Sequence, residues 1–506
     1  MKRINNALIS VFHKDGLGPI VEKLHDLGVT MYSTGGTQRF IQDLDLPVTA
    51  VESLTAYPSI LDGRVKTLHP KVFGGILARR EAGHLSELAQ FEIPLFDLVI
   101  VDLYPFEKTV ESSEEEDEII EKIDIGGIAL IRAAAKNYKD VVVVPSMEDY
   151  DYLLEIVDNE GAETSLDQRR HLAARAFAVS SHYDTAIFNW MKRGTEVSGW
   201  RWSYSPGTPL RYGENPHQSA EFYGDLEASF TQLNGKALSY NNLVDIDAAI
   251  NLMSEFKDAS PAFVVMKHTN ACGVAIRPTV LEAWKAALAG DPVSAFGGIL
   301  ISNHPIDLAT AQEIDKIFYE VLIAPGFDDD ALDFLSQKSK RILLRLKDYS
   351  GNRRLAKALL KGAIVQDADG VSDGREDFKV VTKKSPSDRE VEDMIFANAC
   401  VKHLKSNAIA LIKDQQLLGM GCGQTSRVDA CRQAIDKASR MGFDLQGAVM
   451  ASDAFFPFPD SIELAHQTGI TAVVQPGGSI KDGLSIDYCD NNQLAMVFTG
   501  HRHFKH

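Results

Sequence analysis

Short apolar runs alternate with segments of helical spacing through the N-terminal part of this chain, and this order restricts the folds open to it. The expected strands are Ala7–Phe12, Val29–Ser33, Leu98–Val101 and Val141–Val144. The expected helices are Leu17–Leu27, Gln38–Leu44, Ile128–Ala135, Tyr150–Asn159 and Leu166–Trp190. The last two strands are apolar throughout, which is typical of strands covered on both faces. Alternation of this kind predicts a parallel, doubly wound α/β sheet.

A domain boundary is expected close to residue 198. A chain of 506 residues is too long for a single hydrophobic core. The segment Ser198–Leu210 has neither strand nor helix periodicity, and it contains Pro206, Gly207 and Pro209, as linkers commonly do. We therefore expect one domain over residues 1–198 and a second over residues 199–506.

The second domain contains a faint internal repeat. Cys272–Arg277 and Cys422–Arg427 share the pattern C-G-x-x-x-R. Each copy is followed by a helical segment and then by a similar short run, which are Leu281–Leu288 and Ser294–Phe296 in the first copy, and Ala430–Ala438 and Ser452–Phe455 in the second. Three matches in the same order predict duplicated α/β subdomains, and the alternative is chance similarity between two βαβ units.

Charge and cysteine content exclude several classes of protein. The 52 basic and 70 acidic side chains give a net charge of −18, which disfavours nucleic-acid binding but leaves room for a small anion in a cationic cleft. The five cysteines include no C-x-x-C pair, which argues against a disulfide framework and a zinc site and for a reducing compartment. They are Cys272, Cys400, Cys422, Cys431 and Cys489.

Targeting signals are not expected in this sequence. No segment approaches the roughly 18 apolar residues of a membrane-spanning helix. The apolar run at the N-terminus is too short, and too polar at its ends, for a signal peptide. We therefore expect a cytoplasmic protein with neither a membrane nor a nucleic-acid partner.

Polar groups gather where the N-terminal strands end. Thr34–Thr37 lies between a strand and a helix, so it is either a plain tight turn or an anion site at a helix N-terminus. Gly63–Pro70 is a polar loop with two cations and a hydroxyl. Further polar groups follow the first and third strands, namely Ser10, Lys14, Asp102 and Tyr104. Ligands of doubly wound sheets bind at the carboxyl ends of the strands, which favours a binding site here.

The sequence Asp124–Gly127 opens the expected helix that ends near Lys136. Asp124 is either the N-cap of that helix or a functional carboxylate. The two glycines are costly as helix residues, so we expect another group to pack closely against them.

Four segments stand out in the second domain, three of them polar and one rich in glycine. Arg211–Gln218 offers an arginine suited to a forked phosphate contact, unless the segment is only a rigid loop. Lys267–Asn270 ends an apolar strand with a cation and an imidazole, which suits proton transfer, although such a pair alone is usually structural. Gly419–Gly423 imitates a dinucleotide fingerprint, but its third glycine is replaced by Gln424. The tail His501–His506 is expected to pack or to face a ligand rather than to bind metal.

Seven motifs occur here in the order found in the bifunctional AICAR transformylase/IMP cyclohydrolase family, which the chain resembles over its whole length. They are GRVKTLHP, DIGG, AAAKN, RYGENPHQ, KHTN, SAFGG and SDAFFPF. The resemblance implies a methylglyoxal-synthase-like N-terminal domain and two C-terminal subdomains similar to cytidine deaminase. The deaminase zinc ligands are absent from this sequence, so no catalytic metal is expected.

The resemblance also implies roles for particular residues. Nucleotide binding in the cyclohydrolase part falls to Ser10, Lys14, Thr34, Gly36, Arg64, Lys66 and Thr67. Ring closure falls to Lys66, Tyr104, Asp124 and Lys136. Formyl transfer falls to Lys267, His268 and Asn407. Binding of the ribonucleotide or the folate falls to Arg211, Tyr212, Asn241, Arg427, Phe455, Phe458, Asp460 and Arg502.

The implied chemistry is formyl transfer from 10-formyltetrahydrofolate, the co-substrate, to the 5-amino group of AICAR, followed by dehydrative closure of formyl-AICAR to IMP. Family members form homodimers, and a structural monovalent cation is compatible with the resemblance. Two other readings are an NAD-dependent oxidoreductase, based on the alternating strands and helices and on the glycines near residue 421, and a non-catalytic nucleotide-binding regulatory module. Titration with NADH or AICAR separates the first reading from the family activity, and formation of inosinate separates the second.

Overall fold

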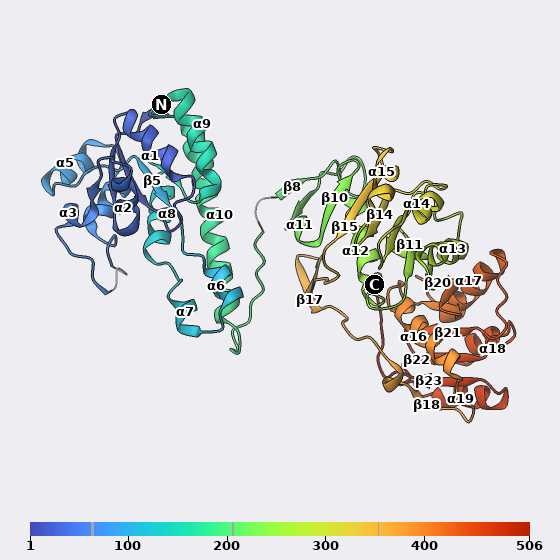
Figure 1. Ribbon diagram of the computed structural model, residues 1–506. Helices are drawn as coiled ribbons and strands as arrows, with labels where there is room; N and C mark the ends of the chain where they lie inside the picture. The colour runs from blue at the N-terminus through green and yellow to red at the C-terminus, as the bar shows by residue number, and fades with distance from the viewer. Residues whose placement is uncertain (62–64, 205–206, 353) are drawn as a thin grey trace. The chain divides into compact units, whose positions relative to one another are not determined.

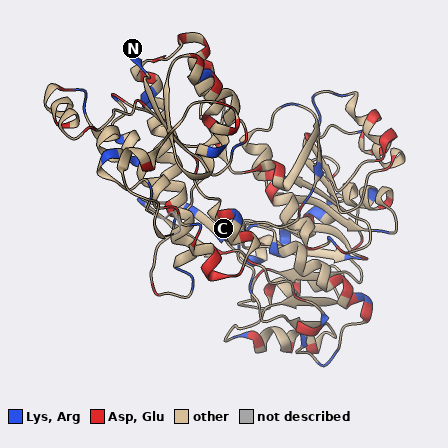
Figure 2. Cartoon of the chain, turned by 60° about the vertical axis from the view of Figure 1, so that its left-hand side comes forward, with Lys and Arg blue, Asp and Glu red and all other residues tan. Residues whose placement is uncertain are grey.

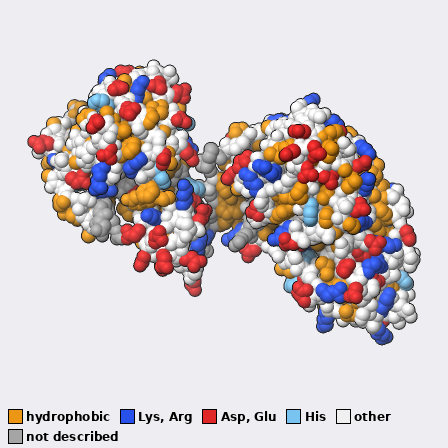
Figure 3. Space-filling model, in the orientation of Figure 1, with side chains coloured by type: hydrophobic (Ala, Val, Ile, Leu, Met, Phe, Trp, Pro, Cys, Tyr) orange, Lys and Arg blue, Asp and Glu red, His pale blue; other side chains and the backbone are white. Residues whose placement is uncertain are grey.

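The computed structural model describes residues 1–61, 65–204, 207–352 and 354–506. The chain divides into two compact units, Met1–Ser205 and Pro206–His506 (Figure 1). Acidic and basic side chains are interspersed along both units in the cartoon and over the visible face (Figures 2 and 3). Among the described residues, no helix is both long and apolar enough to cross a bilayer.

The N-terminal unit is built on a five-stranded sheet in the order β4-β3-β2-β5-β6. Its strands are β2 (Asn6–Ser10), β3 (Thr30–Ser33), β4 (Thr49–Ala50), β5 (Leu98–Val101) and β6 (Val142–Val144). Every neighbouring pair is parallel. The predicted parallel sheet is confirmed, and so is the position of β5.

Helices cover both faces of this sheet, as the fully apolar strands predict. Ala7 and Ile9 face one cluster of buried side chains, while Leu8 between them faces another. The first cluster contains residues of α1 (Leu17–Asp26), α2 (Gly35–Asp43) and α9 (Tyr150–Glu160). The second contains residues of α4 (Pro70–Leu77), α6 (Phe106–Ser112), α8 (Gly126–Lys136) and α10 (Leu166–Met191). This is the doubly wound arrangement, and it leaves the carboxyl ends of the strands open for a ligand.

Smaller elements complete the unit. They are β1 (Lys2–Arg3), which pairs with β7 (Glu163–Thr164), and α3 (Val51–Thr55), α5 (Ala82–Gln90) and α7 (Glu116–Ile120). Helix α10 starts with a capping box in which Ser165 and Gln168 satisfy each other's backbone amides.

The C-terminal unit contains a twelve-stranded sheet in the order β10-β15-β14-β13-β11-β12-β20-β19-β21-β22-β23-β18. Its first half comprises β10 (Phe230–Asn234), α12 (Tyr240–Ser254), β11 (Ala262–Lys267), β12 (Asn270–Ile276), α13 (Val280–Gly290), β13 (Ile299–Ser302), α14 (Leu308–Ile314), β14 (Val321–Ala324), α15 (Asp329–Ser336) and β15 (Ile342–Leu346). Its second half comprises β18 (Lys379–Val380), α16 (Asp388–Lys402), β19 (Ile409–Lys413), β20 (Gln416–Gly421), α17 (Arg427–Arg440), β21 (Val449–Ser452), α18 (Asp460–His466), β22 (Ala472–Gln475), α19 (Asp482–Asn491) and β23 (Ala495–Phe498).

The two halves repeat one order of elements, so the duplication predicted from the sequence is present. The series from α12 to β15 corresponds to the series from α16 to β23. The halves join where β12 pairs with β20 through Ala275 and Gln416. Outside the repeat lie the hairpins β8–β9 (Gly207–Pro209, Glu221–Tyr223) and β16–β17 (Arg354–Leu359, Gly362–Asp367), together with α11 (Leu226–Ser229).

The C-G-x-x-x-R match predicts the wrong residue-to-residue correspondence between the two halves. Gly273 lies inside β12, where a Cβ atom would meet the Ala287 carbonyl of α13, and Gly419 meets Ala434 of α17 in the same way. Gly273 therefore corresponds to Gly419, four residues before the Gly423 that the C-G-x-x-x-R match pairs with it. Ser294–Phe296 likewise precedes β13, whereas Ser452–Phe455 begins at the last residue of β21. Gly273 and Gly419 are both needed for close packing of a strand against a helix, whereas Gly423 makes no such contact.

The glycines that imitate a dinucleotide fingerprint have a packing role. Gly419 and Gly421 lie on β20, which pairs antiparallel with β19, whereas the dinucleotide fold needs a parallel βαβ unit. A Cβ atom on Gly421 would lie 1.9 Å from the Ala430 carbonyl oxygen of α17. Close approach of strand and helix explains these residues without a nicotinamide cofactor.

Gly421→Ala is therefore expected to lower the free energy of unfolding of the C-terminal unit by about 2 kcal/mol or more, because the added methyl overpacks rigid backbone. Denaturant unfolding measures this loss. Gly483→Ala is the matched control, since a Cβ atom on Gly483 meets nothing within 4 Å, and its stability should stay the same or rise slightly. Equal effects of the two substitutions would contradict the packing role.

Candidate active sites

A pocket of about 770 Å³ opens at the carboxyl ends of the N-terminal strands. Most residues expected at the cyclohydrolase site line it, namely Ser10, Lys14, Thr34, Gly36, Lys66, Thr67, Tyr104 and Asp124. They come from the end of β2, the start of α2, the loop before α4, the segment after β5 and the start of α8. Arg64 lies outside the described residues.

Two helix N-termini reach this pocket together with one polar loop. The Lys66 ammonium lies 3.6 Å from the position that a Cβ atom on Gly35 would take, at the start of α2. The Thr67 hydroxyl lies 3.2 Å from the corresponding position on Gly126, at the start of α8. The backbone amides at the start of α2 lie beside the Lys66 ammonium, which supports the anion-site alternative for Thr34–Thr37 over a plain tight turn.

The glycines after Asp124 make room for polar groups, as their cost in a helix predicts. The Gly127 amide donates a 2.6 Å hydrogen bond to Asp124 Oδ1, and a Cβ atom on Gly127 would lie 2.6 Å from Oδ2. Burial raises the pKa of the Asp124 carboxyl, while the amides of Gly127 and Tyr104 and the charge of Lys66 oppose this shift. The N-cap residue of α8 is Ile125, so Asp124 is not itself the N-cap, although its side chain bonds the Gly127 amide of the first turn. Asp124 is also a carboxylate with a perturbed pKa in a pocket, which is typical of a functional group.

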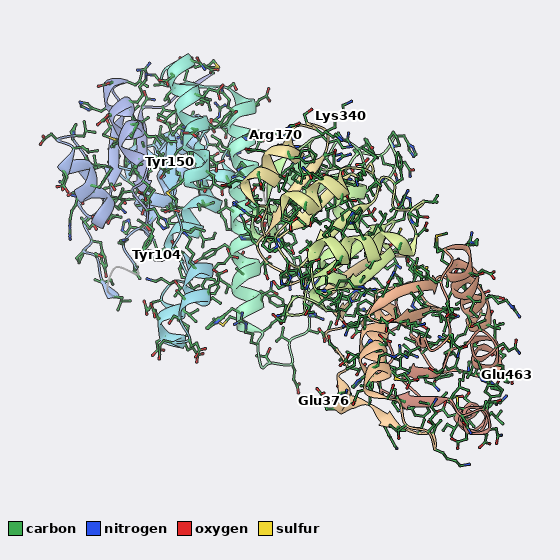
Figure 4. The ribbon with its side chains drawn as sticks, turned by 45° about the vertical axis from the view of Figure 1, so that its right-hand side comes forward. Tyr104, Tyr150, Arg170, Lys340, Glu376 and Glu463 are labelled. Carbon is green, nitrogen blue, oxygen red and sulfur yellow. The ribbon has the colours of Figure 1, made fainter. Side chains whose placement is uncertain are left out.

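Neighbouring groups in the pocket are also perturbed. Burial, and then the charge of Asp124, raises the pKa of Tyr104, which follows β5 and is labelled in Figure 4. Burial and repulsion from Lys66 lower the pKa of Lys14, against the attraction of Asp102. The Lys14 ammonium also donates a 2.8 Å hydrogen bond to the Phe12 carbonyl. Two cations, a phenol and a carboxylate therefore line one cavity, and nearby charges affect the pKa of Lys14, Tyr104 and Asp124.

Lys136 is not brought to this pocket. It is the last residue of α8, the helix whose first residues line the cavity, and its side chain is exposed. An eleven-residue helix is about 16 Å long, which separates Lys136 from Asp124 within one chain.

Sequence reasoning missed the residues that support the pocket. The Tyr183 hydroxyl of α10 accepts a 2.8 Å hydrogen bond from the Asp124 amide and donates one of 2.6 Å to the Lys122 carbonyl, which fixes the loop before α8. His13 Nδ1 lies 2.6 Å from Asp102 Oδ2. Phe12 and Lys122 also line the cavity. Position at a strand end is a usable signal for Phe12, but nothing in the sequence near Tyr183 indicates its role.

In the C-terminal unit, Lys267 and His268 lie where β11 turns into β12. The Lys267 ammonium donates a 2.7 Å hydrogen bond to the Phe296 carbonyl. His268 and Thr269 have φ values of 51° and 60°, and their amides donate hydrogen bonds of 3.3 and 2.8 Å to the Asp245 carboxylate. Asp245, which the sequence did not single out, therefore holds this left-handed turn and presents the exposed His268 ring.

A second polar cluster surrounds Asn407 and Arg427. The buried Arg427 guanidinium donates to Ser452 Oγ (2.7 Å), Asp453 Oδ1 (2.8 Å) and Asn407 Oδ1 (3.0 Å). The Asn407 amide nitrogen donates to the carbonyls of Gln424 (3.0 Å) and Thr425 (3.3 Å). Arg427 thus orients Asn407, and the Asn407 amide must leave one of these carbonyls before it can donate to a substrate.

The C-terminal tail packs against this cluster, as expected for a packed terminus. The His503 amide donates 3.0 Å to the Asp453 carbonyl, and the Ser406 amide donates 2.9 Å to the Lys505 carbonyl. Asp373 lies 2.6 Å from His501 Nδ1 and 3.1 Å from His503 Nε2, so both neighbours of Arg502 are anchored.

The remaining residues fall into two groups. Arg211 stacks over the Tyr212 ring at 5.3 Å, and Asn241 of α12 donates 3.1 Å to the Glu214 carbonyl, so this loop joins the helix that carries Asp245. Phe455, Phe458 and Asp460 lie between β21 and the first residue of α18, with both rings exposed. The first group is connected to the His268 turn, because α12 carries both Asn241 and Asp245.

The His268 turn also contacts the segment that bonds Asn407. The Cys422 thiol lies 3.4 Å from Asn270 Oδ1, and Asn407 bonds Gln424 two residues further along.

Comparison with known proteins identifies the family. The family model described as AICARFT/IMPCHase bienzyme matches residues 134–437, and the one described as MGS-like domain matches residues 16–129. A Bacteroides thetaiotaomicron protein named "Bifunctional purine biosynthesis protein PurH" is 59% identical over 506 residues, covering 100% of this chain and 99% of its own length. The chain belongs to the AICARFT/IMPCHase bienzyme family. Proteins of the same name from Chlorobaculum parvum and a Thermoanaerobacter species are 43% and 44% identical, each with 99% of both chains covered.

Membership of the AICARFT/IMPCHase family disfavours the two other readings. The oxidoreductase reading rests on glycines that pack β20 against α17. The regulatory-module reading accounts only for an MGS-like domain, whereas the AICARFT/IMPCHase match extends to residue 437. Within the described part of the chain, no three His, Cys, Asp or Glu side chains are grouped so that they could hold a metal.

Proposed function

We propose that the two activities of this family are divided between the two units, with IMP cyclohydrolase in the N-terminal unit and AICAR formyltransferase in the C-terminal unit. The protein is a bifunctional enzyme of purine biosynthesis that formylates AICAR and closes formyl-AICAR to IMP. The division is supported by two separate sets of cations, Lys14 with Lys66 in one unit and Lys267 with Arg427 in the other. The proposed boundary is that expected from the sequence, 1–198 and 199–506.

The residues that line the N-terminal pocket support ring closure at this place. The start of α2, with Lys14, holds the phosphate of formyl-AICAR, so the ring end of the nucleotide reaches Lys66, Tyr104 and Asp124. The carboxamide nitrogen attacks the formamide carbon, Asp124 accepts the amide proton, and Lys66 with Tyr104 stabilises the alkoxide. Water then leaves. Holding the two reacting groups together supplies much of the rate. Lys136 lies outside the pocket lining, so it takes no part in this proposed reaction within one protomer.

The rate of cyclisation is expected to fall on acidification, and to begin falling at a higher pH than it would with an aspartate of ordinary pKa. Burial raises the pKa of Asp124 from its usual value of about 3.9, and only the ionised form accepts a proton. The rate is therefore full above the raised pKa and falls as the pH drops through it. The pH profile of kcat/KM measures this limb. Asp124→Asn should remove the limb and lower the rate about 100-fold. An unchanged acidic limb in that variant would contradict the assignment.

Formyl transfer needs a base because the AICAR amine is a weak nucleophile. His268, exposed on its strained turn, takes the amine proton as nitrogen attacks the formyl carbon of the co-substrate 10-formyltetrahydrofolate. Asn407 and Lys267 stabilise the charge on the formyl oxygen, and Lys267 can protonate the departing nitrogen. Arg211, Tyr212, Asn241, Arg427, Phe455, Phe458, Asp460 and Arg502 are proposed to bind the ribonucleotide and the folate.

We propose that a structural monovalent cation binds beside Asp453. Its Oδ1 atom pairs with Arg427, whereas the buried Oδ2 atom has no hydrogen-bond partner among the described residues. Carboxylate oxygen is a suitable ligand for a hard cation. The cation would fix the Arg427–Asp453 pair and through it Asn407. We further propose that the protein is cytoplasmic and forms a homodimer, as the family resemblance implies.

The function is tested by supplying purified protein with AICAR and 10-formyltetrahydrofolate. Inosinate should form, and formyl-AICAR supplied alone should also be converted. Binding of AICAR without any turnover would favour the regulatory module, and tight NADH binding without AICAR binding would favour the oxidoreductase.

A further inference from the structure

Phe12 exposes an aromatic ring to the N-terminal pocket. It follows β2, lines the cavity, and is 40% exposed although its neighbour Val11 is buried. A phenylalanine left partly in water forgoes the gain from burying apolar surface. The ring therefore offers apolar area that a flat ligand can cover. None of the roles assigned above involves Phe12.

The scaffold holds this ring in a fixed orientation. The Phe12 ring meets Tyr104 edge-to-face, with centroids 5.3 Å apart and an interplanar angle of 89°. It meets His13 at 4.8 Å and 81°. His13 is itself fixed, because its amide donates 2.8 Å to Asp102 Oδ2 and its Nδ1 lies 2.6 Å from the same oxygen. Edge contacts of this kind restrain the ring while leaving area of the ring free.

The pocket therefore has two chemically different parts. One part is the anion site at the start of α2, where Lys14 and Thr37 share the Val11 carbonyl. The other is the Phe12 ring beside Tyr104, with the Lys122 ammonium 5.8 Å from the ring centroid. A ligand that satisfies both parts carries a phosphate at one end and a flat heteroaromatic ring at the other.

We infer that Phe12 is the stacking platform for the imidazole ring of formyl-AICAR and for the purine ring of IMP. Stacking places the ring end of the substrate next to Tyr104, which Phe12 also orients. This inference rests on the proposed cyclohydrolase function of the N-terminal unit and adds a binding residue to it.

Phe12→Ala is expected to raise the KM for formyl-AICAR about 10-fold, equivalent to about 1.4 kcal/mol, because base–aromatic stacking is lost. Phe12→Trp should keep the KM within about 3-fold of wild type, because indole stacks at least as well. IMP should also quench the fluorescence of Phe12→Trp beyond any change seen in the wild-type protein. This second measurement tests the platform even if Phe12→Ala fails to fold.

Phe177→Ala is the matched control. Phe177 lies on α10 outside the pocket lining, is 43% exposed, and has the Arg132 guanidinium 5.6 Å from its ring centroid, so its exposure and cationic neighbour match those of Phe12. Its KM should not change. An unchanged KM in folded Phe12→Ala, or no added quenching in Phe12→Trp, would overturn the platform while cyclisation by wild type persists. Failure of the wild-type protein to cyclise formyl-AICAR would instead overturn the proposed function.

Discussion

His268→Ala should lower the rate of formyl transfer about 1,000-fold and leave the cyclisation of supplied formyl-AICAR at the wild-type rate. A positioned general base contributes between about 100-fold and 10,000-fold, and His268 is the exposed imidazole on the turn held by Asp245. Separate assays with AICAR plus 10-formyltetrahydrofolate and with formyl-AICAR alone measure the two rates.

The second assay is an internal control, because it reports on the N-terminal unit of the same preparation. His466→Ala, at the end of α18, is a control for loss of an imidazole elsewhere in the C-terminal unit and should retain formyl transfer. Loss of both activities in His268→Ala would count against separate sites. A reduction of less than 10-fold in formyl transfer would remove His268 from the role of base.

Lys66→Met should have the opposite result, lowering cyclisation about 1,000-fold and leaving formyl transfer unchanged. The Lys66 ammonium lies over the start of α2, and its charge acts on Asp124 and Lys14. Methionine keeps most of the side-chain length and removes the charge that is proposed to stabilise the alkoxide. Removal of one such electrostatic group costs about 100-fold to 1,000-fold in kcat.

Lys108→Met on α6 is the matched control, since Lys108 is exposed and lies outside the pocket lining. Its cyclisation rate should equal that of wild type. If Lys66→Met and Lys108→Met lose the same amount of activity, the effect reflects general charge and the site assignment is wrong.

The N-terminal fold could be predicted from the sequence because the spacing of apolar residues along the chain marks each strand and each helix. Alternation of apolar strands with helices was sufficient for the parallel sheet, and β5 has the predicted bounds. The glycines after Asp124 signalled a close contact because glycine is costly in a helix, and Thr67 and Asp124 make that contact.

Features that depend on contacts between distant segments could not be predicted in this way. Tyr183 fixes the Asp124 loop from α10, and Asp245 fixes the His268 turn from α12, yet neither carries a local signal. The register of the duplication failed for the same reason, because Gly273 and Gly419 are equivalent only through the helices they touch. Lys136 follows a family motif, but the length of α8 carries it away from the pocket.

Under the proposed function, two separate sites in this chain act in turn on the same phosphorylated imidazole. This proposal is tested most directly by mixing His268→Ala with Lys66→Met and supplying AICAR and 10-formyltetrahydrofolate. Neither variant alone should make inosinate at an appreciable rate, whereas the mixture should make it after a lag while formyl-AICAR accumulates. No inosinate from the mixture, although each variant retains its remaining activity, would show that the two activities are not divided between separate sites.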